Sequence, residues 1–184
     1  MTRYSSTQRG QKYGRPAIAL HWLVAGLMIA GFALGWFMTD IPGFTPAKLR
    51  YYSWHKWIGC TVLALAIVRI AWRIRHAAPP PSGTSKRWQR VSAELVHRAL
   101  YVLMLVIPVT GYLYSSSANV PVVFLGIVPL PRLIAPNPVL KPILKEIHVV
   151  LNYVLLVLVA THVLAALKHH FIDRDGLLHR MLPF

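Results

Sequence analysis

Four long apolar runs constrain the fold of this chain more than any other feature. They cover roughly residues 17–38, 53–72, 95–114 and 147–167, and each approaches the ~20 residues with which a helix crosses the hydrocarbon layer. Of the 184 residues, 55% are hydrophobic and 14% are charged, a balance that a soluble domain of this size would struggle to bury. Because backbone polar groups in lipid must be satisfied internally, the runs predict helices. We expect an all-α membrane protein, a four-transmembrane-helix bundle in which residues 1–184 form a single membrane domain.

The segments outside these runs are consistent with that plan. The first run follows a basic leader, but it is long and lacks a clear small-residue cleavage site, so we expect a retained span rather than a signal peptide. The connection at residues 115–145 is apolar but contains six prolines, which exclude a helix of spanning length. We expect this connection to lie along the outer membrane–water interface, where it either covers a binding site in the bundle or anchors the chain in lipid.

Basic residues are distributed unevenly between the two ends of the predicted bundle. Fourteen lie before the first run, between the second and third runs, or after the fourth: Arg3, Arg9, Lys12, Arg15, Arg69, Arg73, Arg75, Lys86, Arg87, Arg90, Arg98, Lys168, Arg174 and Arg180. Six lie in the other two connections: Lys48, Arg50, Lys56, Arg132, Lys141 and Lys145. By the positive-inside rule, both termini are cytoplasmic. A net charge of +15 also occurs in nucleic-acid-binding proteins, but these residues flank lipid spans, so we expect no nucleic-acid partner.

Four histidines lie inside the apolar runs, and the expected topology sorts them into two pairs. His148 and His162 are fourteen residues apart on the fourth span, roughly 21 Å along the helix axis and within about 40° of the same face. The orientation of the spans places His21 and His162 toward the cytoplasmic face, and His55 and His148 toward the outer face. This arrangement predicts two haems stacked in the bundle, an inner and an outer one.

The composition of the spans favours haem over other ligands of these histidines. A lone intramembrane histidine can hydrogen-bond across a bundle, but four at matched depths indicate a function. A zinc or iron site without porphyrin would need carboxylates or thiolates beside the imidazoles, and the spans contain almost none. Cys60 is the only cysteine, so a Cys-x-x-Cys-His attachment is excluded and the haems are expected to be b-type.

The second span contains a pair, His55 and Arg69, with the same spacing as the two histidines of the fourth span. Arg69 follows His55 by fourteen residues, which places it on the same interior side at the level of the inner haem. Its guanidinium can pair with a haem propionate, or it can snorkel to the cytoplasmic surface with Arg73 and Arg75. We favour the propionate interpretation.

Several short motifs follow one another along the chain. They are ALHW at 19–22, HKWIG at 55–59, His97 with Tyr101 and a following PVTG at 108–111, KEIH at 145–148, and His162 with KHH at 168–170. Their order and spacing resemble the bacterial cytochrome b561 family over nearly the whole chain. Members are four-helix, di-haem b proteins of the bacterial inner membrane, and the best-studied branch oxidises periplasmic superoxide and reduces ubiquinone. The resemblance implies His21 and His162 as inner-haem ligands, and His55 and His148 as outer-haem ligands.

Two further histidines lie near the cytoplasmic end. His97 begins the third span and is an alternative inner-haem ligand, a quinone contact or an interface residue. His169 lies two turns beyond His162 on nearly the same side. The resemblance implies that His169 donates a hydrogen bond or a proton to a quinone. Position 19, where the family can offer a polar partner, is Ala19 here.

The outer connections carry six cations against Asp40 and Glu146, which leaves a charge of +4 on that side. Such a field would attract a small anion such as superoxide, although anionic lipid headgroups are the simpler explanation. We expect an oxidoreductase that oxidises periplasmic superoxide to oxygen and reduces ubiquinone through two haem b groups. One alternative is a di-haem anchor that passes electrons from a periplasmic dehydrogenase or hydrogenase partner subunit to quinone. A second alternative is a haem-free structural or transport bundle.

Overall fold

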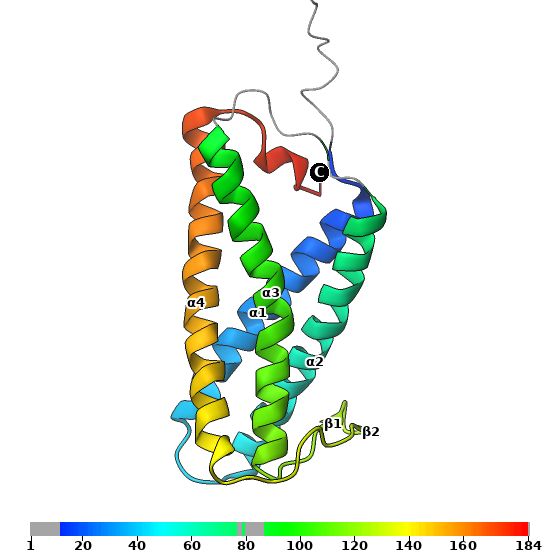
Figure 1. Ribbon diagram of the computed structural model, residues 1–184, viewed down its shortest axis with the longest axis vertical. Coiled ribbons are helices and arrows are strands. Elements are labelled where there is room, and N and C mark those ends of the chain that lie inside the picture. Colours follow the sequence, from blue (N-terminus) through cyan, green and yellow to red (C-terminus); the bar gives the residue numbers. More distant parts are fainter. Residues whose placement is uncertain (1–11, 77–78, 80–86, 184) are drawn as a thin grey trace, which may run out of the picture.

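Four long helices form the body of the molecule (Figure 1). The computed structural model describes residues 12–76, 79 and 87–183. Within these residues, α1 covers Arg15–Asp40, α2 Pro46–Arg75, α3 Arg87–Ser117 and α4 Leu140–Lys168. All four are long and apolar enough to cross a membrane, which confirms the predicted four-helix membrane fold. Three of the basic residues used for the orientation lie outside the described residues: Arg3, Arg9 and Lys86.

Local sequence signals explain where α2 and α4 begin. The Thr45 hydroxyl accepts a hydrogen bond from the Lys48 backbone N–H at 3.1 Å, and Pro46 occupies the first turn of α2. The helix α4 begins at Leu140, five residues before the end of the expected connection. Pro142 does not prevent this, because the first turn of a helix has backbone N–H groups without intrahelical partners.

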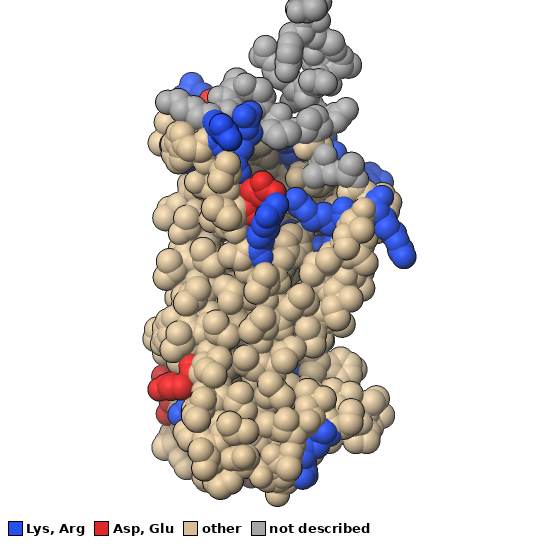
Figure 2. All heavy atoms as spheres, in the orientation of Figure 1, with Lys and Arg blue, Asp and Glu red and all other residues tan. Residues whose placement is uncertain are grey.

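The helices pack around a small core. In chain order α1 packs against α2, α2 against α3, and α3 against α4. Val24, Ala66 and Met104 are buried at the centre of the bundle and contact Leu65 and Tyr101. Many large apolar side chains on the outside are exposed, and in the space-filling view the middle of the bundle carries few charges (Figure 2). An apolar outer surface of this kind is what a lipid solvent requires.

A short hairpin in the third connection lies beside one end of the bundle, next to α2 (Figure 1). Its strands β1, Val123–Phe124, and β2, Val128–Pro129, pair antiparallel. The Trp57 indole of α2 donates to the Val123 carbonyl at 2.7 Å, and the Tyr112 hydroxyl of α3 donates to the Pro131 carbonyl at 2.7 Å. These bonds fix the connection to α2 and α3. We call this end of the bundle the hairpin end.

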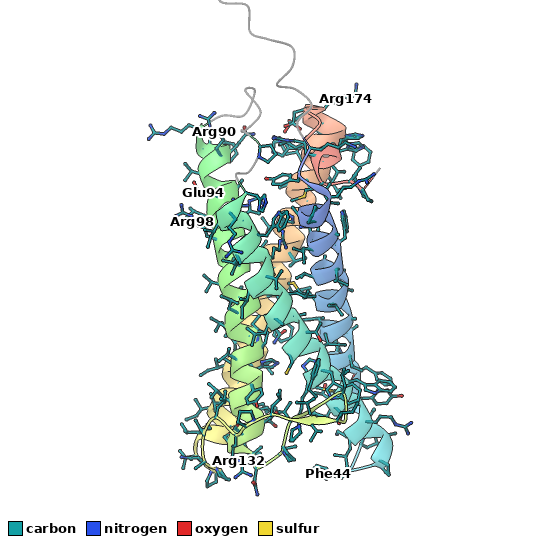
Figure 3. All side chains as sticks on the ribbon, turned by 90° about the vertical axis from the view of Figure 1, so that its right-hand side faces the viewer. Phe44, Arg90, Glu94, Arg98, Arg132 and Arg174 are labelled. Carbon is teal, nitrogen blue, oxygen red and sulfur yellow. The ribbon has the colours of Figure 1, made fainter. Side chains whose placement is uncertain are left out.

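The opposite end gathers basic side chains and both ends of the described chain. Arg90, Arg98 and Arg174 lie there, whereas Arg132 lies at the hairpin end (Figure 3). We call it the charge-rich end. After α4 the chain continues as a π-helix, η2, His169–Asp173, and a 3-10 turn, η3, Leu178–Arg180. This C-terminal tail returns to α1, because the Trp22 indole donates to the Met181 carbonyl at 2.8 Å.

Candidate functional site

The outer histidine pair, His55 on α2 and His148 on α4, meets toward the hairpin end. The two ring centroids are 6.2 Å apart and the ring planes are nearly perpendicular, at 85°. His55 Nδ1 donates to the Gly31 carbonyl at 3.0 Å, and His148 Nδ1 donates to the Ile107 carbonyl at 3.0 Å. A carbonyl can only accept, so each Nδ1 carries the proton and each Nε2 keeps a lone pair. Both imidazoles are therefore in the tautomer that binds a metal through Nε2.

Close backbone approach holds these two rings in place. A Cβ atom at Gly111 would lie 2.9 Å from His148 Cε1, and one at Gly35 would lie 3.1 Å from His55 Cε1. Glycine is therefore required at position 111, where even the smallest side chain would displace the imidazole. The Thr110 hydroxyl lies 3.2 Å from His148 Nδ1 and donates to the Ile107 carbonyl at 2.8 Å. Sequence reasoning gave no role to Thr110 or Gly111, although both belong to the PVTG motif.

A largely apolar cavity lies beside the outer pair. Both imidazoles line it, together with aliphatic side chains of all four helices. Gly59 is also part of the lining, and a Cβ atom added there would meet no other atom within 4 Å. Space bordered by imidazoles and aliphatic groups suits a flat, apolar macrocycle better than a hydrated ion.

The inner histidine pair, His21 on α1 and His162 on α4, lies toward the charge-rich end. Its ring centroids are 6.3 Å apart, whereas those of His97 and His162 are 5.2 Å apart. An iron bound by two imidazoles has Fe–N bonds of about 2 Å, and each nitrogen lies about 1.1 Å from its ring centre, so the centroids should be about 6.2 Å apart. The spacings of the inner and outer pairs fit a bis-imidazole haem. His97 and His162 are too close to have an iron between them.

Arg69 contacts the inner pair directly, at the depth expected from its spacing. Its Nη2 donates to His21 Nδ1 at 2.8 Å. The guanidinium also lies over the Tyr101 ring, 5.2 Å from its centroid, and the Arg73 guanidinium lies 5.8 Å from the same centroid. Both arginines line a cavity at the charge-rich end, with Lys12 and Trp72 among its other residues. Arg69 thus lies between the inner pair and a positively charged cavity that neither histidine of the pair lines.

The C-terminal tail holds His169 by its Nδ1 atom. This nitrogen lies 2.7 Å from Asp175 Oδ2 and 3.1 Å from Asp173 Oδ2. Asp175 is fixed in turn, because its Oδ1 accepts the Leu177 backbone N–H at 3.0 Å. The arrangement leaves His169 Nε2 for another partner. Asp175 is six residues away in a segment without a recognisable motif, and nothing in the sequence pointed to this contact.

Comparisons with known proteins find similarity over nearly the whole chain. The family described as prokaryotic cytochrome b561 matches residues 12–184. Cytochrome b561 homolog 2 of Escherichia coli (strain K12) is 32% identical over 178 residues, which cover 97% of this chain and 95% of that protein. The probable superoxide oxidase CybB of Yersinia pestis is 29% identical over 177 residues, which cover 94% of this chain and 97% of that protein.

Proposed function

Since this chain belongs to the prokaryotic cytochrome b561 family, a family of membrane electron-transfer proteins that bind b-type haem, we propose that it carries electrons through two haems stacked in its bundle. His55 and His148 would hold the outer haem, and His21 and His162 the inner one. The observation that carries this proposal is the ring spacing of 6.2 Å and 6.3 Å in two pairs at two depths of α4. The chain is a multi-pass protein of the bacterial inner membrane.

The orientation of the bundle suggests which reaction occurs at each face. We place the charge-rich end and both termini in the cytoplasm, by the positive-inside rule. The hairpin end would then face the periplasm, where six cations outnumber two acidic residues and the net positive charge would attract small anions. Superoxide is such an anion, and the Yersinia pestis relative is named a probable superoxide oxidase.

The reaction balances with ubiquinone as the acceptor. Two superoxide anions each lose one electron and leave as oxygen, and one ubiquinone gains two electrons and two protons to become ubiquinol. When bound, b haems supply one-electron carriers between these half-reactions. His169 would give a proton through Nε2 to the quinone oxygen, while Asp175 orients its ring. His21 would carry a proton on Nδ1 when its Nε2 binds iron, so Arg69 would exchange its contact with that nitrogen for a propionate of the inner haem, which offsets its burial.

Haem content tests the ligand assignment. The purified chain should contain two b haems per polypeptide, measured as the pyridine haemochrome. His162→Ala should contain one, because the inner iron loses an axial ligand. Two haems with unchanged spectra in His162→Ala would show that the inner assignment is wrong.

Spectra recorded with a superoxide-generating system test the donor. The haems of the isolated protein should be reduced within the mixing time, and superoxide dismutase should abolish the reduction. No reduction until a dehydrogenase or hydrogenase is added would favour an anchor subunit, with a partner subunit as the donor. A purified protein without a haem absorption band would leave only the alternative of a haem-free structural or transport bundle.

A further inference from the structure

The Nδ1 atoms of the outer pair and of His21 have partners of opposite kind. In the outer pair both Nδ1 atoms donate to backbone carbonyls, at 3.0 Å each. In the inner pair His21 Nδ1 faces a donor instead, the Arg69 guanidinium at 2.8 Å. The outer pair and His21 therefore differ in the kind of group that contacts Nδ1 of the imidazole.

The surroundings of the two pairs differ in charge as well. The outer cavity is lined almost entirely by aliphatic and aromatic side chains. Near the inner pair, Arg69 and Arg73 both lie against Tyr101, with guanidinium carbons 5.2 Å and 5.8 Å from the ring centroid. Arg69 thus places a half-buried positive charge in contact with the inner pair, and Arg73, exposed in the last turn of α2, adds a second charge on the other side of the contact with Tyr101.

The carbonyls at the outer pair and the charge at the inner pair act in opposite directions on an iron bound at the respective site. An imidazole that donates Nδ1–H to a carbonyl becomes a stronger electron donor, which stabilises the ferric state and lowers the reduction potential. At the inner pair, the positive charge of Arg69 beside His21 stabilises the ferrous state. An imidazole that binds iron through Nε2 carries its proton on Nδ1, so the guanidinium would then face a propionate instead of His21, and its charge would act from there.

We propose that Arg69 raises the reduction potential of the inner haem above that of the outer haem. Electrons entering at the hairpin end would then pass downhill to the charge-rich end, where the quinone is reduced. Arg69 touches no reacting atom in this scheme and acts through its charge. The inference rests on the proposed function, because it requires two haems.

A redox titration of the purified two-haem protein, followed by its absorption spectrum, tests the proposal. The unaltered chain should show two midpoint potentials. In His148→Ala, which should retain only the inner haem, the higher potential should remain. If the inner haem retained in this variant has the lower of the two potentials, the proposal is overturned, and no substitution of Arg69 is needed to show it.

Substitution of Arg69 supplies the second test. Arg69→Gln should lower the inner potential and leave the outer one in place, whereas Arg69→Lys should retain most of the inner potential because it keeps the charge. Arg98→Gln is the matched control, since this exposed arginine pairs with Glu94 on the outside of α3 and should change neither potential.

The outcomes separate the inference from the proposed function. Two haems with an unchanged inner potential in both Arg69 variants would overturn the inference alone. If Arg69→Gln fails to retain the inner haem, Arg69→Lys and the order of potentials in the unaltered chain still decide the question. A chain that binds fewer than two haems would overturn the proposed function together with the inference.

Discussion

The outer and inner histidine pairs share α4 and have nearly the same ring separation, yet different parts of the chain hold them. The outer rings are held by backbone, through the carbonyls of Gly31 and Ile107 and the bare Cα of Gly111. The inner pair contacts a charged side chain, Arg69, near the end of the bundle that the C-terminal tail covers. The outer site thus depends on how closely the helices approach, and the inner site on side-chain charge.

The largest effect is expected when an outer ligand is removed. His148→Ala should reduce the haem content from two to one per chain, because the outer iron loses one of its two imidazoles. Pyridine haemochrome measurement of the purified variant provides the count. His97→Ala is the control and should retain two haems, since the spacing of His97 and His162 leaves no room for an iron. Loss of a haem in the control would mean that three histidines share the inner site.

A smaller but selective effect is expected from Gly111→Ala. The added methyl group would lie 2.9 Å from His148 Cε1, and overpacking of this kind costs about 1–3 kcal/mol. Outer-haem affinity should therefore fall by about 5-fold to 150-fold, measured by haem titration of the apoprotein. Gly26→Ala is the matched control, because its added Cβ would meet nothing within 4 Å. Equal affinities in the two variants would contradict the close contact at His148.

Loss of the Thr110 hydroxyl should have a milder effect on the same site. Thr110→Val keeps the shape of this buried side chain and removes its bonds to the Ile107 carbonyl and His148 Nδ1. We expect both haems to remain and the free energy of unfolding to fall by about 1 kcal/mol. Thermal unfolding in detergent measures the change. Val109→Ala, on the half-exposed neighbour, serves as a comparison that leaves the hydroxyl in place.

The smallest effect is expected where the tail meets α1. Trp22→Phe removes the indole bond to the Met181 carbonyl, at a cost of about 1 kcal/mol or less because the side chain is half-exposed. Cleavage of the tail by a protease should become faster, while the outer-haem spectrum stays the same. An altered outer haem would show that the two ends of the bundle are coupled more tightly than their separate contacts suggest.

Much of the fold could be read from the sequence because lipid imposes a simple rule. A run of about twenty apolar residues has few alternatives to a helix in a membrane, and the positions of His148 and His162 then follow from helix periodicity. The depth of Arg69 could be inferred in the same way. The exact ends of the helices could not be predicted as well: α4 begins at Leu140, before Pro142, within the stretch expected to be a connection.

Contacts between helices could not be read from the chain. Gly111 is spaced no differently from a glycine that packs helices, and only the position of α4 shows that it makes room for His148. Asp175 lies in a tail without periodicity, so its bond to His169 depends on how the chain turns after η2. The separation of His97 from His162 likewise depends on the approach of α3 to α4.

The sequence by itself determined a four-span membrane bundle, two depths of histidine and the charge asymmetry between the ends, because hydropathy, helix periodicity and charge act along a single chain. Only the tertiary structure decided which nitrogen of His21, His55 and His148 is bonded and by what partner. Hydrogen bonds such as those of His55 to α1 and His21 to α2 join residues 24 and 48 positions apart. Such bonds require specific helix rotations and distances, which many different packings of the same four spans would not provide.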